Sequence, residues 1–247
     1  MTAIIIFFIL HWYVSLFFQT FFAHRYAAHK MITMSPAWEK VFFVLSWIGQ
    51  GSSYIGVRAY GIMHRMHHAY ADTEKDPHSP KFSDNLFDMM LKTQAVYSKV
   101  FWEKVPFEER FTKGVPAWKS FEVFANSIPV RIAWGLIYIA FYAYFAPNAW
   151  WYLLLPLHFI MGPLHGAIIN WFAHRIGYRN FDVSDLSRNL MPVDIFMMGE
   201  GYHNNHHKHG SRPNFGVKWH EVDPTYLIMK GMAAIGIIKW RRNPVSA

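Results

Sequence analysis

The sequence predicts an all-α integral membrane protein in a single domain, residues 1–247, with about three transmembrane helices, an interfacial helix and a helical cap. Three observations predict this class. Hydrophobic residues make up 53% of the chain and charged residues only 16%, against roughly a quarter in soluble domains. Two long stretches carry no charge, and all 24 Lys and Arg residues lie outside them. The chain also has no cysteine, which excludes a disulfide scaffold, thiolate metal ligands and a cysteine nucleophile.

Three segments are expected to cross the membrane: residues 2–23, 132–146 and 149–173. The first carries no charge, and about 20 apolar residues suffice to span the hydrocarbon core. The other two form a helical hairpin with its tip at Pro147, and the short first arm requires Arg131 to extend toward the interface. Residues 37–56 contain only a short continuous apolar run, so they are expected to form an interfacial helix.

The positions of the basic residues predict the topology. Fourteen Lys and Arg residues lie from Arg25 to Arg131, and ten lie from Arg175 to Arg242. Under the positive-inside rule both regions are cytoplasmic, which three crossings satisfy. The net charge of +8 is then a feature of the membrane surface, and membrane lipids rather than a nucleic acid are the expected partners. Residues 83–124 mix charged and apolar residues and are expected to form a helical cytoplasmic cap.

Histidine is the unusual residue, with 15 in 247. Two copies of the pattern His-x-x-His-His occur, where a random chain of this composition would hold about 0.05. In a helix, residues three and four apart share a face, so each pattern directs three imidazoles to one place. A further cluster has two histidines five apart, about 140° around an ideal helix, so the helix should end or bend between them. The clusters are His24 and His29; His64, His67 and His68; and His203, His206 and His207.

A fourth group lies at the end of the third expected span. His158, Gly162, Gly166, Asn170 and His174 recur every four residues and would form one stripe along a helix. We interpret the two glycines as helix-packing residues and assign Asn170 and His174 to a metal site.

The donor set favours two transition metals. Imidazole ligands suit Zn, Cu, Fe or Ni, and eight cluster histidines plus His174 are too many for one ion. A hydrolytic zinc site would carry His-Glu-x-x-His, which is absent from the sequence. Two irons that activate dioxygen at the membrane surface fit best.

These motifs resemble those of the membrane fatty acid desaturase family, close to the acyl-CoA and acyl-lipid delta-9 desaturases. The resemblance covers most of the chain from about Phe21 onward. The segments that carry it are His24–His29, His64–His78, Asn170–Arg179, Gly199–His207 and Trp219–Pro224.

The resemblance implies a centre of two Fe ions held by the nine histidines, with Asn170 acting through a water. It implies that O2 is reduced to water while a saturated fatty acyl chain gains a cis double bond, with delta-9 position expected, on the cytoplasmic face of a membrane (the cell inner membrane in a bacterium). A separate electron donor such as ferredoxin, rubredoxin or a cytochrome b5-like protein is expected. Animal members place Arg-Asp before the second box, where the Arg helps to hold the CoA head, whereas this chain has Ile62-Met63. The difference weakens the case for a CoA-linked acyl chain and leaves carrier-protein-linked and lipid-linked acyl chains open.

Several residues outside the nine histidines also receive expected roles. Asp72, Asp76 and Glu200 are candidates to bind the second ring nitrogen of ligating histidines. His11 and His165 are expected to pack between helices, and His158 to pack or to line a tunnel.

Two other functions stay open at this point. A related hydroxylase or oxygenase differs from a desaturase only in the fate of the substrate radical. A membrane metal-handling protein would carry ligands along its spans, whereas these clusters lie beyond the helix ends.

Overall fold

The computed structural model describes residues 1–241, which are mostly helical. Two short strands, β1 and β2, pair antiparallel with Ile32 opposite Trp240. The α-helices are α1 (Thr2–Phe18), α2 (Pro36–Gln50), α3 (Val57–Tyr70), α4 (Leu86–Phe101), α5 (Glu109–Thr112), α6 (Lys119–Asn126), α7 (Ile128–Phe145), α8 (Leu155–Phe159), α9 (Met161–Ala167), α10 (His203–Lys208) and α11 (Pro224–Ala234). The strands are β1 (Ile32–Thr33) and β2 (Lys239–Trp240). The π-helices are η1 (Gln19–Ala28) and η5 (Ile168–Phe172), and the short 3-10 helices are η2 (Gly51–Ser53), η3 (Pro80–Phe82) and η4 (Ala149–Leu154).

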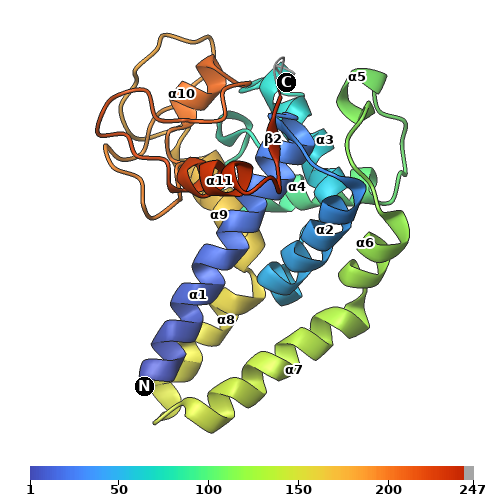
Figure 1. Ribbon diagram of the computed structural model, residues 1–247, viewed down its shortest axis with the longest axis vertical. Coiled ribbons are helices and arrows are strands. Elements are labelled where there is room, and N and C mark those ends of the chain that lie inside the picture. Colours follow the sequence, from blue (N-terminus) through green and yellow to red (C-terminus); the bar gives the residue numbers. More distant parts are fainter. Residues whose placement is uncertain (242–247) are drawn as a thin grey trace.

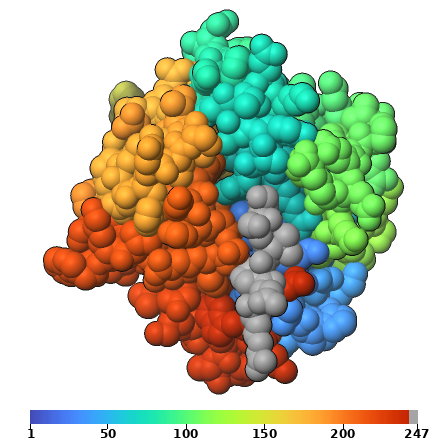
Figure 2. Space-filling view, turned by 90° about the horizontal axis from the view of Figure 1, so that it is seen from above, coloured from blue at the N-terminus to red at the C-terminus, as the bar shows by residue number. Residues whose placement is uncertain are grey.

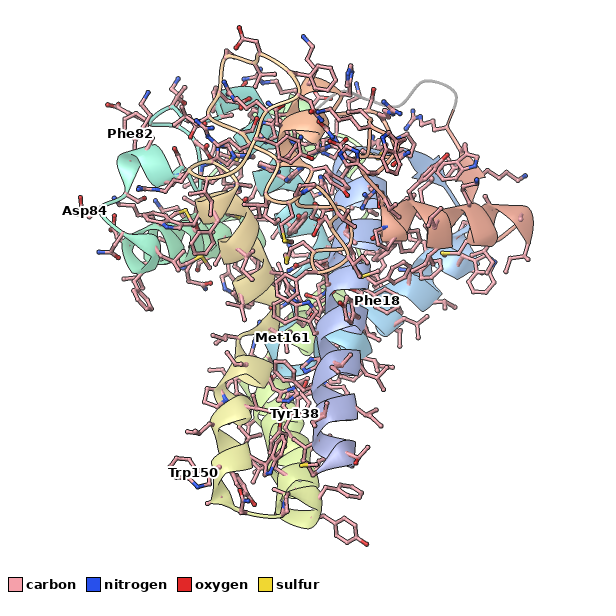
Figure 3. All side chains as sticks on the ribbon, turned by 90° about the vertical axis from the view of Figure 1, so that its left-hand side faces the viewer. Phe18, Phe82, Asp84, Tyr138, Trp150 and Met161 are labelled. Carbon is pink, nitrogen blue, oxygen red and sulfur yellow. The ribbon has the colours of Figure 1, made fainter. Side chains whose placement is uncertain are left out.

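The molecule consists of a long stem and a wider head (Figures 1 and 3). The stem comprises residues 2–18 and 128–167, and the head comprises residues 57–126 and 173–241. In Figure 3 Tyr138 and Trp150 lie down the stem, Phe18 and Met161 lie near its junction with the head, and Phe82 lies at the edge of the head. From above, the head shows residues of about 60–120 on one side and 170–220 on the other (Figure 2).

The stem contains the segments that are able to cross a membrane. Thr2–Ala28 and Ile128–Phe145 are each long and apolar enough, and the bent pair of Ala149–Phe159 and Met161–Phe172 makes a third if counted as one span. This agrees with about three predicted spans. The outer faces of the stem expose large apolar side chains such as Ile6 and Leu136, which water would not favour but lipid tails would accept.

The third span is not the continuous helix that we expected over residues 149–173. Its two halves meet at an angle of 70° between α8 and α9. Pro163 accounts for the break, because it has no N–H to bond the carbonyl of Phe159 and its ring would clash with that carbonyl. The prediction of a single stripe from His158 to His174 is therefore wrong. Gly162 still packs closely against a neighbouring segment, and His174 still lies in a histidine cluster.

Polar side chains hold the stem together from inside. His11 of α1 lies with its Nδ1 2.6 Å from Nδ1 of His158 on α8, and Tyr142 of α7 bonds the other nitrogen of His158 at 2.9 Å. Since bonds between buried polar groups replace those lost with water, this contact joins three helices. Both histidines thus have the packing role that we expected.

Helix α2 runs beside α1 (Figure 1), and the chain reverses its direction after α2 ends. Ser35 caps its first turn by accepting a bond from the backbone of Trp38, and Gly51 ends it with a φ of +56°. A side chain at Gly51 would also overlap the hydroxyl of Tyr138, so only glycine fits this turn. The chain then returns to the head as α3, and the position of α2 relative to a membrane surface stays a prediction.

Two helix glycines differ in the space around them, so their substitution by alanine should have opposite effects on stability. A Cβ at Gly162 would lie 2.7 Å from the backbone oxygen of Ser53, whereas one at Gly231 on α11 meets nothing within 4 Å. Gly162→Ala should therefore lower the free energy of unfolding by about 1–3 kcal/mol through overpacking. Gly231→Ala should raise it by about 0.5–1 kcal/mol through helix propensity.

Thermal unfolding of the detergent-solubilised protein measures both effects. An unchanged melting temperature in Gly162→Ala would show that α9 and η2 do not pack this closely.

Candidate metal centre

The first histidine pair is delivered by a change in helix winding. Helix α1 continues into the π-helix η1, in which His29 N–H donates to the carbonyl of His24 at 3.1 Å. A π-helix bonds residue i to i+5, so residues five apart come to lie one above the other. His24 and His29 thereby reach the same side, and their ring centroids lie 4.9 Å apart. The expected bend or end between them takes this form.

The other two clusters lie on α3 and α10, which present the same pattern to each other. His64 and His68, four apart, join His24 and His29, and His206 of α10 completes this group of five. His203 and His207, four apart on α10, join His67 of α3 and His174 to form a group of four. Each helix thus gives a pair to one group and its third histidine to the other. The expectation that all three imidazoles of a pattern meet at one place is therefore wrong, because the residue next to the second member of the pair projects about 100° away.

Within each group the ring nitrogens that converge are Nε2. In the group of five, Nε2 of His29 lies 2.8 Å from that of His64, and Nε2 of His68 lies 2.9 Å from that of His206. In the group of four, Nε2 of His174 lies 3.0 Å from that of His203, and His67 lies 3.2 Å from His207. All candidate ligand atoms of a group lie within 4.8 Å of one another.

The residues present fit two transition-metal ions. Nε2 atoms that face one another over such distances offer several lone pairs to one point, and imidazole is a good ligand for iron and its neighbours. Burial and neighbouring imidazoles hold the pKa of His64, His68, His203, His206 and His207 well below the ordinary value, so that these rings are neutral and their lone pairs are free.

Carboxylates lie against the opposite ring nitrogens. Nδ1 of His24 lies 2.7 Å from Glu200, Nδ1 of His67 lies 3.0 Å from Asp76, and Nδ1 of His174 lies 2.9 Å from Asp72. Such a bond fixes the ring orientation and keeps Nε2 available to a metal. Burial alone would lower the pKa of His67, but Asp76 raises it above the ordinary value. Asp72, Asp76 and Glu200 thus each contact a candidate ligand ring, and their role in supporting metal ligands stays a prediction.

A fourth carboxylate was not predicted. Asp185 lies 2.9 Å from Nδ1 of His207. It belongs to the irregular segment between η5 and α10, where no helical or strand periodicity marks which side chain turns inward. The sequence therefore holds no signal that separates it from Asp182, whose side chain is fully exposed.

Arg25 was also missed, although it lies between the first two histidines. It is fully buried, bonds Glu200 at 3.0 Å and Asp223 at 2.7 Å, and stacks 3.8 Å from the centroid of Phe215. Phe215 in turn packs on His206. A buried cation with two carboxylate partners holds the first cluster, the loop before α10 and the C-terminal segment together.

A cavity of about 370 Å³ reaches both histidine groups, one through His64 and the other through His203. This is within the size range of binding pockets, and its wall is mostly apolar. Asn170 and His78 line it, and Nε2 of His78 has no partner among residues 1–241. His165 lines it as well, and its ring also packs edge-on against Trp12 of α1 with 4.6 Å between the centroids, so it packs between helices as expected although its nitrogens have no partner among residues 1–241. Gly166 is a wall residue too, since a Cβ there would meet nothing nearer than 3.9 Å.

The comparison with protein families decides which family this chain belongs to. The family model for fatty acid desaturases matches residues 1–241. The chain belongs to the fatty acid desaturase family. It is 30% identical to the sn-1 stearoyl-lipid 9-desaturase of Synechocystis over 87% of this chain and 64% of that protein, so it matches less than two thirds of that relative's length.

Two other relatives are slightly less similar, and one of them is named for a different reaction. The sn-1 stearoyl-lipid 9-desaturase of Anabaena variabilis is 27% identical over 87% of this chain and 74% of that protein. The hex-5-enoyl-[acyl-carrier protein] acetylenase of Moorena producens is 26% identical over 92% of this chain and 73% of that protein.

The contact between Asp185 and His207 predicts a selective loss of metal from the group of four histidines. Asp185→Asn should weaken binding at that site by about 10- to 100-fold, because the ring of His207 loses its charged partner. Metal analysis by mass spectrometry after dialysis should show the ratio of metal to protein fall from two toward one.

Asp182→Asn is the matched control, since Asp182 is exposed in the same segment and should leave the ratio unchanged. Equal ratios in both variants would mean that Asp185 does not support a ligand.

Proposed function

We propose that this chain is an oxygen-dependent fatty acyl desaturase that introduces a cis double bond, at the delta-9 position, into a saturated acyl chain. The observation that carries the proposal is that two adjacent histidine groups reach one mostly apolar cavity of about 370 Å³. Family membership and the stearoyl-lipid 9-desaturase relatives support the same reaction and the same position of the double bond.

In this proposal His24, His29, His64, His68 and His206 hold one iron. His67, His174, His203 and His207 hold the other, and Asn170, which lies on the cavity wall, acts through a water. Removal of hydrogen from an unactivated methylene pair, with reduction of O2 to water, is the chemistry that a pair of irons supplies when bound. The carboxylates of Asp72, Asp76, Asp185 and Glu200 orient the ligating rings.

The cavity wall performs the remaining task, which is to choose the methylene pair. Met63, Ile169 and Met197 line the interior near the histidines and exclude water from an acyl chain. A chain confined by these side chains presents only a short segment to His64 and His203. The position of the double bond then follows from how far the chain extends on either side of the histidines.

Membrane sidedness and the electron source complete the proposal. The basic head lies at the cytoplasmic side under the positive-inside rule, which is the side of a soluble reductant. Two electrons per turnover come from a separate carrier such as ferredoxin, rubredoxin or a cytochrome b5-like protein. A basic surface accelerates association with an acidic carrier through electrostatic steering.

The test is the fatty acid profile of a host that lacks its own desaturase, measured by gas chromatography with mass spectrometry after derivatisation of double bonds. The wild type should yield a new cis-monoene, whereas His67→Ala should yield none. His209→Ala is the matched control, because His209 is exposed and lies outside both groups. It should retain the product.

Hydroxylated chains in place of the alkene would transfer the proposal to the oxygenase reaction. An unchanged profile together with two irons per purified chain, assayed with added reductant and O2, would contradict acyl oxidation altogether. Loosely bound metal that crosses vesicle membranes would then favour a metal-handling protein.

A further inference from the structure

The wall of the cavity changes in character from one end to the other. At the inner end Leu16, His165 and Met197 are buried, with exposed fractions of 0–1%. At the other end Gln94 and Trp102 line the same cavity yet face the outside, and Trp102 is 54% exposed. The cavity therefore opens to the outside beside Gln94 and Trp102, and we call this opening, between α4 and the beginning of α7, the mouth.

The mouth lies where the stem meets the head. Arg131 and Asn126 line it, and Arg131 belongs to the first turn of α7, which continues as the candidate span Ile128–Phe145. Helix α4 begins just after Asp84, which lies at the edge of the head to one side of the stem (Figure 3). The mouth is thus at the height where lipid headgroups would surround this stem, rather than at the far surface of the head.

Helix α4 contributes to the cavity on one side and exposes apolar side chains on another. Met90 and Tyr97 line the cavity on one side. On another side Phe87 is 79% exposed and Leu91 is 72% exposed, and these two residues are one turn apart. An exposed apolar face next to a membrane-spanning stem is typical of a helix that lies in the interface. Because this face lies next to the stem, we expect the lipid surface of the membrane to cover it.

Arg131 is a cation without a carboxylate partner among residues 1–241. It donates to the backbone oxygens of Ser52 and Tyr54 and to the side-chain oxygen of Asn126, the last two at 2.8 and 2.7 Å. Its four bonds use four of the five guanidinium N–H groups. One N–H and the whole positive charge are left for a ligand at the mouth.

We propose that the mouth between α4 and α7 admits acyl chains sideways from the membrane, and that Arg131 binds the phosphate end of a glycerophospholipid. The inference rests on the proposed desaturase function and names the form in which the acyl chain arrives. The substrate is a lipid that never leaves the bilayer, and its polar end stays at Arg131 and Gln94 while its acyl chain extends past the histidines.

Photocrosslinking tests the route without any turnover. The chain has no cysteine, so a photoreactive maleimide attaches only at an introduced one. Gln94→Cys carries it at the mouth, Leu136→Cys carries it on the outer face of α7, and Lys208→Cys carries it on the head. The probe is radiolabelled stearoyl phosphatidylglycerol in nanodiscs of diphytanoyl lipid, whose branched chains do not fit a narrow cavity.

Label at Gln94→Cys should saturate and should fall when unlabelled stearoyl phosphatidylglycerol is added. Label at Leu136→Cys should rise linearly with probe, as expected for bulk lipid, and Lys208→Cys should gain none. Linear, uncompetitive labelling at Gln94→Cys would overturn lateral entry.

Substitution of Arg131 tests the headgroup contact. Arg131→Gln should raise KM for stearoyl phosphatidylglycerol by about tenfold with little change in kcat, because a charge-assisted bond is lost. Arg131→Lys should restore most of the affinity, and Lys99→Gln, an exposed cation on α4, should change nothing. Melting temperatures of the variants separate this effect from a purely structural role, which would lower stability and spare KM.

The outcomes separate this inference from the proposed function. Desaturation of stearoyl-CoA or a stearoyl carrier protein, without saturable lipid labelling, would overturn lateral entry and leave the desaturase intact. Saturable labelling that depends on Arg131, with no desaturation by the iron-loaded and reduced protein, would support the portal and overturn the reaction.

Discussion

The arrangement of the head depends on the mutual approach of nine imidazole rings. Nε2 lone pairs that face one another across about 3 Å repel, and a cation placed between them changes repulsion into attraction. Each ring is also fixed from behind where a carboxylate or a packed side chain touches its other edge. The position of Glu200 against His24, and of Asp76 against His67, therefore ties distant segments to the same centre. Much of the polar burial in the head follows from this requirement, including the unusual cost of enclosing Arg25.

The pattern His-x-x-His-His has a geometric purpose that differs between its positions. Two residues four apart project to one side of a helix, while the residue next to the second projects about 100° away. In α3 this gives His64 and His68 to one group and His67 to the other, and α10 repeats the division with His203 and His207 against His206. Two helices that face each other with this pattern define two neighbouring sites. The sites are adjacent because each helix supplies consecutive histidines to both of them.

Much of this could be predicted from residues whose spacing constrains their direction. The clusters on α3 and α10 could be assigned because helical periodicity fixes which side chains converge. His24 and His29 did not fit an ideal helix, and that misfit predicted the change that the π-helix η1 supplies. Asp185 could not be found in this way, because an irregular segment carries no periodicity. The straight third span failed for another reason: Pro163 lies within an uncharged run, where hydropathy alone hides the break.

The same break has a consequence for the acyl cavity. A straight helix over residues 149–173 would keep one face toward α1 along its whole length, as the stripe implied. Because α9 turns by 70° from α8, Gly166 and Asn170 form part of the cavity wall instead, while Gly162 stays packed on the η2 turn. The kink thus opens space for a chain next to the group of four histidines. Polar side chains such as Arg131 and Gln94 line the mouth, while the interior wall combines apolar side chains with buried polar ones such as His165 and Glu200. In the proposed function the polar end of the substrate stays at the mouth, and the depth of the histidines then sets which carbons of its acyl chain meet them.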